Sequence, residues 1–133
     1  DNRGHVHLAG RRKNLLITSF GRNISPEWPE ALLLGDPRIL QAVVVGDGKP
    51  APVALLVTMP GLAPAQVDAL LAAVNAQLPD YARLAGWQAV PPFTPVNGLA
   101  TGNGRPVRER IIDHHAAAIA AIYANKETPH VLL

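Results

Sequence analysis

ILQAVVV at residues 39–45 and VALLVT at residues 53–58 are two nearly continuous apolar runs, both rich in β-branched residues. Runs of this length and composition are typical of buried strands. The segment between them, GDGKP at residues 46–50, has the composition of a turn. The sequence therefore predicts that the two runs pair as the central strands of a small sheet.

Helical patterns lie on both sides of these strands. Ser25-Pro26-Glu27 predicts a helix start with Ser25 as the N-cap, and the helix should end near Leu34, before Gly35. Pro64 opens a second helix, and a third begins at Pro106. The apolar residues expected on the buried stripe of the second helix are Val67, Leu70, Leu71, Val74 and Leu78, and those of the third are Ile112, Ile119 and Ile122.

Shorter extended segments complete the pattern. Residues 5–8 alternate in polarity and lead through a basic turn to residues 15–18, which predicts an opening hairpin. Residues 87–90 suit a third strand of the sheet, and residues 91–104 form a long loop without periodicity. The predicted fold class is α+β: an N-terminal β-hairpin followed by a small three-stranded sheet packed with helices. Residues 1–133 are expected to form one domain.

Composition excludes several classes of protein. The chain has no cysteine, which rules out disulfides and thiolate metal sites and fits a reducing, cytoplasmic setting. A net charge of only +2 is no basis for a nucleic-acid partner. No apolar run reaches the roughly 20 residues of a transmembrane helix. The chain starts at Asp1, and Met59 is its single methionine, so we expect a domain processed or excised from a longer protein.

Three segments are locally unusual. Residues 10–13 place three cations in a tight turn, which fits a solvated turn or a site equally well. Residues 19–23 put a glycine beside an arginine just before a helix, which suits a phosphate but also a purely structural turn. Residues 97–105 form a glycine-rich loop of the kind that is often functional. Neither GxGxxG nor a Walker lysine pattern occurs, so no self-contained nucleotide site is indicated.

The histidines and serines do not complete a catalytic or metal site. His5 and His7 share a strand face and His114 and His115 are adjacent, but neither pair comes with a suitable third ligand. Ser19 and Ser25 lie outside any GxSxG elbow. Taken residue by residue, the chain therefore holds no complete catalytic set, and no metal ligand is predicted.

Three quoted segments, in this order, resemble a known family. NRGHVHLAGR at residues 2–11 is similar to the end of the stretch D-x-D-G-x-L-x-I-x-G-R. GRRKNLLITSFGRNISPE at residues 10–27 is similar to the hinge and following loop of adenylate-forming enzymes, and FTPVNGLAT at residues 93–101 resembles their F-T-x-x-N-G-L-L-T segment. The resemblance is to the C-terminal lid domain of AMP-binding acyl-CoA synthetases, above all the long-chain fatty-acid–CoA ligase type.

This resemblance implies an ATP-dependent ligase that works in two steps. A fatty or other carboxylic acid reacts with ATP to give an acyl-adenylate, and CoA or a carrier-protein thiol then takes the acyl group. The lid rotates between the steps, which is a gating motion. ATP, CoA and Mg²⁺ would be bound mainly by a large N-terminal domain that this chain lacks. That domain is the implied partner, and the chain alone is expected to be inactive.

The resemblance also implies roles for individual residues. Lys13 corresponds to the hinge on which the lid swings, and Arg11 to an arginine that contacts the nucleotide beside it. Arg22 corresponds to a second nucleotide-contacting arginine, and Ser19 to a position near CoA. Gly21 would let that loop approach a ligand closely.

Arg105 departs from the family pattern, because the family places a lysine at this position that acts during adenylation. Arginine keeps the charge but is larger and planar, with a fork of donors rather than a point charge. We expect Arg105 to lie on an exposed and poorly ordered loop. Besides the ligase lid, two readings stay open: a degenerate, non-catalytic acyl- or nucleotide-binding module, and an independent small domain that matches the family by chance.

Overall fold

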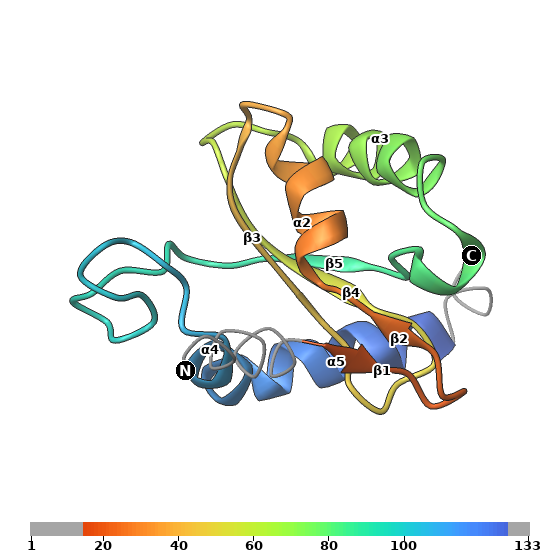
Figure 1. Cartoon of the computed structure of the whole chain (residues 1–133). Coiled ribbons are helices and arrows are strands. Elements are labelled where there is room, and N and C mark those ends of the chain that lie inside the picture. The colour runs from red at the N-terminus through yellow and green to blue at the C-terminus, as the bar shows by residue number, and fades with distance from the viewer. Residues whose placement is uncertain (1–14, 128–133) are drawn as a thin grey trace, which may run out of the picture.

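The computed structural model of the chain describes residues 15–127, and a three-stranded mixed sheet lies at the centre of this part (Figure 1). Strand β3 (Ile39–Val45) pairs antiparallel with β4 (Val53–Thr58), and an irregularity in register lies between Ile39 and Gln41. Strand β5 (Trp87–Ala89) pairs with β4 in parallel. The strand order is β3-β4-β5. The predicted pairing of the two apolar runs and the predicted third strand are confirmed.

A second, smaller sheet contains β1 (Leu16–Ile17) and β2 (Asn23–Ile24), which pair antiparallel. Residues 5–8, the expected partner of the first strand, lie outside the described residues. The partner that the structure shows comes from the C-terminal side, because residues 18–22 turn the chain back on itself. The residues just before the first helix thus form a short hairpin of their own.

Helix α2 (Glu27–Leu34) ends at Gly35 as predicted, but it is not capped as predicted. Pro26 is the N-cap residue, and no side chain caps the helix. The hydroxyl group of Ser25 donates a hydrogen bond of 3.0 Å to the carboxylate of Glu27, so it does not accept one from a backbone N–H of the first turn. The prediction of Ser25 as N-cap is therefore wrong by one residue.

Helix α3 (Pro64–Asn75) confirms the stripe predicted for it. Three residues of the stripe within the helix, Val67, Leu71 and Val74, are buried, and Leu78 is buried just beyond its end. A short 3₁₀ helix, η1 (Asp80–Ala82), then leads towards β5.

The C-terminal segment folds as two helices, α4 (Arg108–His114) and α5 (Ala116–Glu127), where the sequence predicted one. Pro106 does not begin a helix, because its backbone pairs with Ala100 in an isolated bridge. Ile111 is fully buried whereas Ile112 is 37% exposed, so the placement of Ile112 on the buried face is wrong. The prediction holds for Ile122, which is buried, and for Ile119, which packs against the core in part.

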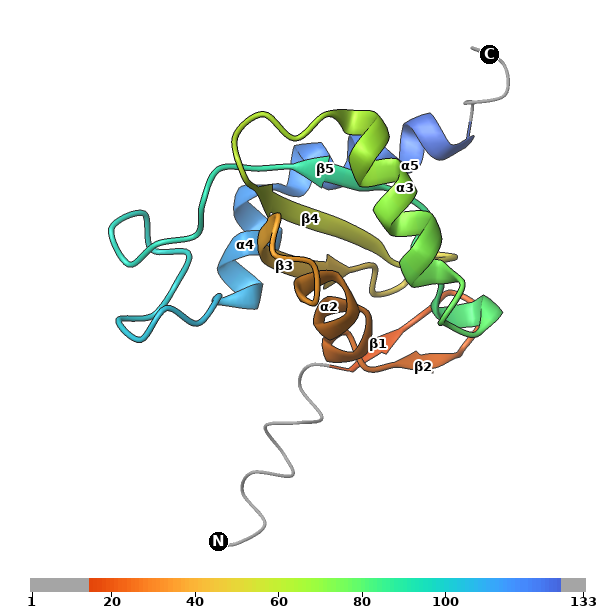
Figure 2. The same ribbon diagram turned by 90° about the horizontal axis from the view of Figure 1, so that it is seen from above.

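Helices cover both faces of the central sheet, and strand alternation explains how (Figure 2). Successive side chains of a strand point to opposite faces. Val44, Ala54 and Leu56 point towards α2 and α3 and form one core cluster with Leu33, Val67 and Leu71. The alternate strand residues Val43, Val45, Val53 and Leu55 point to the opposite face. There they form a second core cluster with Phe93, with Ile111 of α4 and with Ile122 of α5. Burial on both faces is why the strands are apolar throughout, and the α+β fold class is confirmed.

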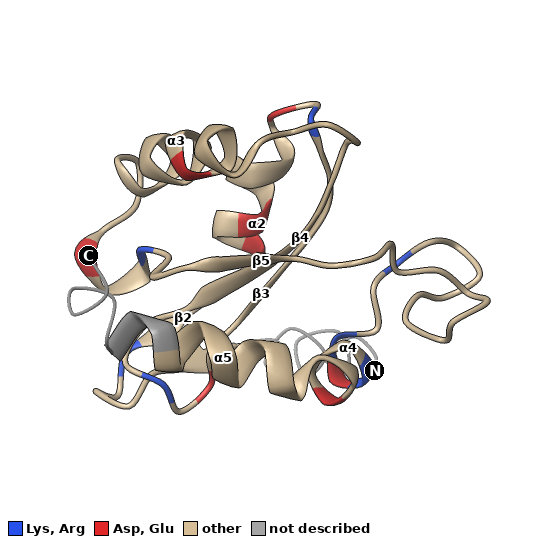
Figure 3. Ribbon diagram, turned by 180° about the vertical axis from the view of Figure 1, so that it is seen from behind, with Lys and Arg blue, Asp and Glu red and all other residues tan. Residues whose placement is uncertain are grey.

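Charged residues lie outside the central sheet. Figure 3 shows that Lys, Arg, Asp and Glu occupy loops and helices and leave the strands of this sheet uncoloured. Within residues 15–127, no helix is both long and apolar enough to cross a membrane.

Candidate functional site

The loop at residues 18–22 holds three of the predicted site residues. The backbone N–H of Gly21 donates to the carbonyl oxygen of Thr18 (2.9 Å), and the N–H of Ser19 donates to the carbonyl oxygen of Lys49 (2.9 Å). Gly21 has a φ of +81°, with open space where a Cβ would stand. Glycine is therefore favoured here by the left-handed backbone conformation. Phe20 at the tip is 77% exposed.

Two open hollows border this loop. One, of about 520 Å³, is lined by Thr18, Phe20, Arg22, Pro50, Asp80 and Tyr81. The other, of about 510 Å³, is lined by Ser19, Gly48, Lys49, Pro50, Ala51, Ala85 and Tyr123. Pro50 belongs to both, so Arg22 and Ser19 face neighbouring hollows of one surface.

Each hollow contains a cation placed over an aromatic ring. The guanidinium carbon of Arg22 lies 4.3 Å from the centre of the Tyr81 ring, and Nζ of Lys49 lies 5.4 Å from that of Tyr123. Such contacts orient a cation without neutralising its charge. The hydroxyl group of Tyr123 donates to the carbonyl oxygen of Ala51 at 2.6 Å, and burial raises the pKa of Tyr123 to about 12, so it remains a donor. This surface can therefore offer positive charge to an anionic ligand.

Arg105 closes a tight turn elsewhere in the fold. The N–H of Thr101 donates to the carbonyl oxygen of Arg105 (2.8 Å), and the N–H of Arg105 donates to Oγ1 of Thr101 (3.2 Å). Between them, Gly104 has a φ of +85°, as the left-handed position of such a turn requires. Arg105 is exposed, as expected. The loop is nevertheless regular, because hydrogen bonds close it into a short hairpin.

Asn97 organises the segment before this hairpin. Its Oδ1 accepts hydrogen bonds of 3.0 Å from the N–H groups of Thr94 and Leu99, and its Nδ2 donates to the carbonyl oxygen of Pro92 at 2.9 Å. The backbone bridge between Ala100 and Pro106 follows directly. Asn97 therefore holds the FTPVNGL segment folded at the base of the hairpin that carries Arg105.

The two candidate regions lie at opposite ends of the described structure. Figures 1 and 2 place the loop between β1 and β2 near one end of the central sheet and the loop that precedes α4 beyond the other. The structure thus brings Ser19, Gly21 and Arg22 together but keeps Arg105 apart from them. Arg11 and Lys13 lie outside the described residues.

A buried ion pair that the sequence analysis missed lies between these regions. The carboxylate of Glu30 on α2 accepts hydrogen bonds from the Arg108 side chain (2.7 and 3.2 Å) and from the backbone N–H of Val44 (2.7 Å). Arg108 also donates to the carbonyl oxygen of Val44 (3.1 Å). One signal was present in the sequence: Glu30 lies three residues before the buried Leu33 and so on the apolar side of its helix.

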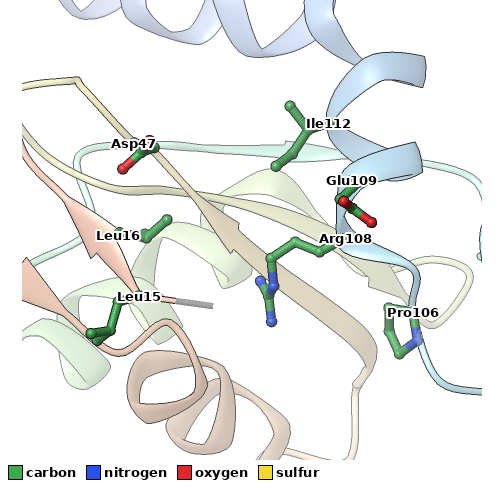
Figure 4. A pocket seen from close by; sticks show the side chains of 7 residues that line it. All are labelled: Leu15, Leu16, Asp47, Pro106, Arg108, Glu109 and Ile112. Atoms are coloured by element: carbon green, nitrogen blue, oxygen red, sulfur yellow. The ribbon is translucent and has the colours of Figure 1, made fainter. Parts of the chain in front are cut away.

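Arg108 also lines a pocket of about 360 Å³ (Figure 4). Its other lining residues are Leu15, Leu16, Asp47, Pro106, Glu109 and Ile112. The pocket therefore joins the first described residues after the predicted hinge to the base of the Arg105 hairpin. The carboxylate of Asp47 fixes its strand side by accepting a hydrogen bond of 2.9 Å from the N–H of Ile17.

The two adjacent histidines contact each other and an aromatic residue. The rings of His114 and His115 lie edge to face, with their centres 4.7 Å apart. The ring of His115 also lies edge to face with that of Phe93, with 6.3 Å between the ring centres. Burial lowers the pKa of His115, and the neighbouring His114 lowers it further. Among the described residues, no group of three or more His, Cys, Asp or Glu side chains could hold a metal ion.

The sequence and structure can now be compared with known proteins. A sequence model described as "AMP-binding enzyme C-terminal domain" matches residues 13–127. This chain belongs to the C-terminal domain family of AMP-binding enzymes. This AMP-binding C-terminal domain is 30% identical, over 96% of its length, to the long-chain-fatty-acid–CoA ligase FadD15 of Mycobacterium tuberculosis. It spans 25% of that relative's length.

Solved structures of similar domains agree with this assignment. The AMP-binding C-terminal domain matches the A-PCP didomain of a carboxylic acid reductase from Segniliparus rugosus in complex with AMP, with a TM-score of 0.74 and 25% identity over 86% of this chain and 18% of that one. It also matches an acyl-CoA synthetase from Brucella canis, with a TM-score of 0.62 and 25% identity over 82% of this chain and 20% of that one. The reading as an unrelated domain with a chance match is thereby excluded.

Proposed function

We propose that this domain is the mobile lid of an ATP-dependent ligase that adenylates a carboxylic acid, most simply a fatty acid, and passes the acyl group to CoA or a carrier-protein thiol. Residues 1–133 would then be one lid domain that acts with a large N-terminal domain in the cytoplasm. The domain's likeness to a long-chain-fatty-acid–CoA ligase supports the choice of acid.

The observation that carries this proposal is the placement of two candidate regions at opposite ends of one small sheet. A lid that serves two half-reactions needs two faces, one for each orientation against its partner. The hairpin with Arg105 is proposed to face the active site during adenylation, and the surface with Ser19 and Arg22 during thioester formation. The charge on each region suits the phosphates of ATP or CoA.

Arg22 and Lys49 are the described residues that fit a phosphate best. Both are cations at open hollows, and the guanidinium carbon of Arg22 lies 4.3 Å from the centre of the Tyr81 ring, a contact that orients the side chain and leaves its charge in place. Mg²⁺ would be held by carboxylates of the large domain together with phosphates of the nucleotide. When bound, ATP supplies the leaving group that activates the acid, while the lid residues orient the phosphates and exclude water.

The arginine at position 105 is the reason to consider a second candidate function. If lysine is required there, the domain belongs to a degenerate module that binds an acyl group or nucleotide without adenylating it. The two functions differ in what Arg105 contributes. A positioned cation next to developing charge accelerates a reaction by roughly 10²–10³.

The experiment uses the domain joined to its large domain and measures the two half-reactions separately. Under the ligase proposal, Arg105→Ala slows acyl-adenylate formation by roughly 10²–10³ and leaves thioester formation from supplied acyl-adenylate intact. Arg38→Ala, which removes an arginine that belongs to neither candidate region, is the matched control and should change neither rate. A rise in adenylation from almost none in Arg105→Lys would support the degenerate module. Equal adenylation rates in the parent protein and both Arg105 variants would show that the hairpin is not catalytic.

A further inference from the structure

The ion pair between Glu30 and Arg108 is unusual for its surroundings. The two side chains are only 10% and 20% exposed, and their closest approach is 2.7 Å. Removing two charges from water costs several kcal/mol per ion, so a buried pair is a weak source of stability. A pair retained at such a cost calls for another role, and the elements that it joins indicate which.

The pair ties three elements together. Glu30 lies on α2, Val44 on β3 and Arg108 at the first position of α4. Because β3 is an edge strand of the central sheet, its outward backbone groups need partners from elsewhere. Glu30 binds the N–H of Val44, and Arg108 binds its carbonyl oxygen. The ion pair thus holds the start of α4 against the sheet edge at a fixed position along the strand.

The start of α4 is also the base of the hairpin that carries Arg105. Arg108 lies three residues after Arg105 in the sequence. Between them, the N–H of Val107 donates to the carbonyl oxygen of Leu99 (2.8 Å), which closes the hairpin stem. Nothing within the described residues binds the Arg105 side chain itself, so the direction in which it leaves the domain depends on the stem. The stem depends in turn on Arg108.

We propose that Arg108 is a positioning residue for adenylation: anchored on Glu30 and Val44, it fixes the hairpin that presents Arg105 to the active site. This inference rests on the proposed function of Arg105. In this proposal Arg108 contacts neither substrate nor nucleotide. The planar fork of arginine is required, because one guanidinium has to reach both carboxylate oxygens of Glu30 and a backbone carbonyl oxygen at once.

The test variant is Arg108→Lys, which keeps the charge but not the fork. Arg38→Lys is the matched control, because Arg38 also pairs with a carboxylate, that of Asp36 at 2.7 Å, in an ion pair that includes no residue of the hairpin. Should Arg108→Lys fail to fold, the double variant Glu30→Leu with Arg108→Met replaces the pair by apolar side chains, an exchange that proteins often tolerate.

The first readout is amide hydrogen exchange in this chain, which needs no activity. The amides of Thr101 and Val107 should exchange about tenfold faster in Arg108→Lys than in the parent and the Arg38→Lys control, while the amide of Leu55 in the sheet centre keeps its rate. Unchanged exchange at Thr101 and Val107 would overturn the inference. An equal increase in the exchange rate of the Leu55 amide would also overturn the inference, because the ion pair would then stabilise the whole fold.

The second readout is a double-mutant cycle on acyl-adenylate formation in the protein joined to its large domain. Misplacement of a catalytic group by about 1 Å costs up to roughly 10²-fold, so Arg108→Lys should slow adenylation by between 10- and 10²-fold. It should slow the Arg105→Ala variant no further, and thioester formation from supplied acyl-adenylate should keep its rate. Independent, multiplying effects of the two substitutions would overturn the inference. An Arg105→Ala variant with normal adenylation would instead overturn the proposed function, and hydrogen exchange would still decide whether Arg108 fixes the hairpin.

Discussion

Two adjacent isoleucines of α4 provide a stringent test of the fold. Ile111 is fully buried between the sheet and α5, whereas Ile112 is 37% exposed at the pocket beside Arg108. The periodicity of the sequence predicts instead that Ile112 is buried. Substituting each residue by alanine compares the two assignments with the same chemical change in the same helix.

The structure sets the expected size of each effect. Ile→Ala removes three carbon atoms, and each buried carbon contributes about 0.8 kcal/mol. At the fully buried Ile111 the cavity left behind adds to this loss, while the higher helix propensity of alanine offsets about 0.4 kcal/mol. Ile111→Ala should therefore destabilise the domain by about 3 kcal/mol. Ile112→Ala should cost less than about 1 kcal/mol, because much of its side chain already contacts water.

The assay is urea unfolding of the chain, followed by circular dichroism. For a domain of this size, a loss of about 3 kcal/mol moves the midpoint by roughly 1.5 M urea. An unchanged slope of the transition shows that only stability has changed. Equal midpoints for the two variants, or a lower midpoint for Ile112→Ala, would refute the burial of Ile111 and the exposure of Ile112 and would favour the buried Ile112 that the sequence predicts.

Two further predictions concern His115, at the end of α4, and Gly46, beside Tyr123 of α5. Burial lowers the pKa of His115 below its usual 6.5, so the unfolded chain binds more protons than the folded one as pH falls through 6.5. The urea midpoint should consequently drop between pH 7.5 and pH 5.5, and His115→Gln should remove this component of the drop; an identical pH profile in the variant would contradict it. Gly46→Ala should cost about 2 kcal/mol, because a Cβ at φ +145° would lie 2.8 Å from the Tyr123 hydroxyl oxygen and 2.9 Å from a backbone carbon. Gly48→Ala, at φ +75° with open space around it, should cost only about 1 kcal/mol, and comparable melting temperatures for the two would argue against the close packing at Tyr123.

The parts of the fold predicted correctly depend on neighbouring residues. The strands at residues 39–45 and 53–58 are marked by composition and by the turn between them, so both their ends and their pairing follow from local sequence. The buried stripe of α3 follows from helical spacing in the same way. Positions of glycine also carry information, since Gly21 and Gly104 both adopt the left-handed conformation in segments that the sequence marks as a turn or loop.

The parts predicted wrongly or missed depend on contacts between distant residues. Arg108 and Glu30 are 78 residues apart, and no local pattern links them. The late start of α4 has a similar origin, because the residues ahead of it are held by the bridge between Ala100 and Pro106. Of the two adjacent isoleucines, Ile111 is the one that packs against the sheet, and this contact is not visible in the local sequence.

The arrangement of the candidate site follows from the topology of the sheet rather than from any motif. The loop at residues 18–22 contacts the β3–β4 turn through the hydrogen bond from Ser19 to the Lys49 carbonyl oxygen, which fixes it at one end of those strands. The Arg105 hairpin follows β5, which runs parallel to β4 and so leads the chain to the other end. A single fixed orientation of this domain against a partner surface would leave one of these regions facing away from it. The separation therefore supports the proposal that this domain changes orientation between two reactions. In that proposal, accurate presentation depends on the anchoring of each region to the rigid sheet, through Lys49 at one end and Arg108 at the other.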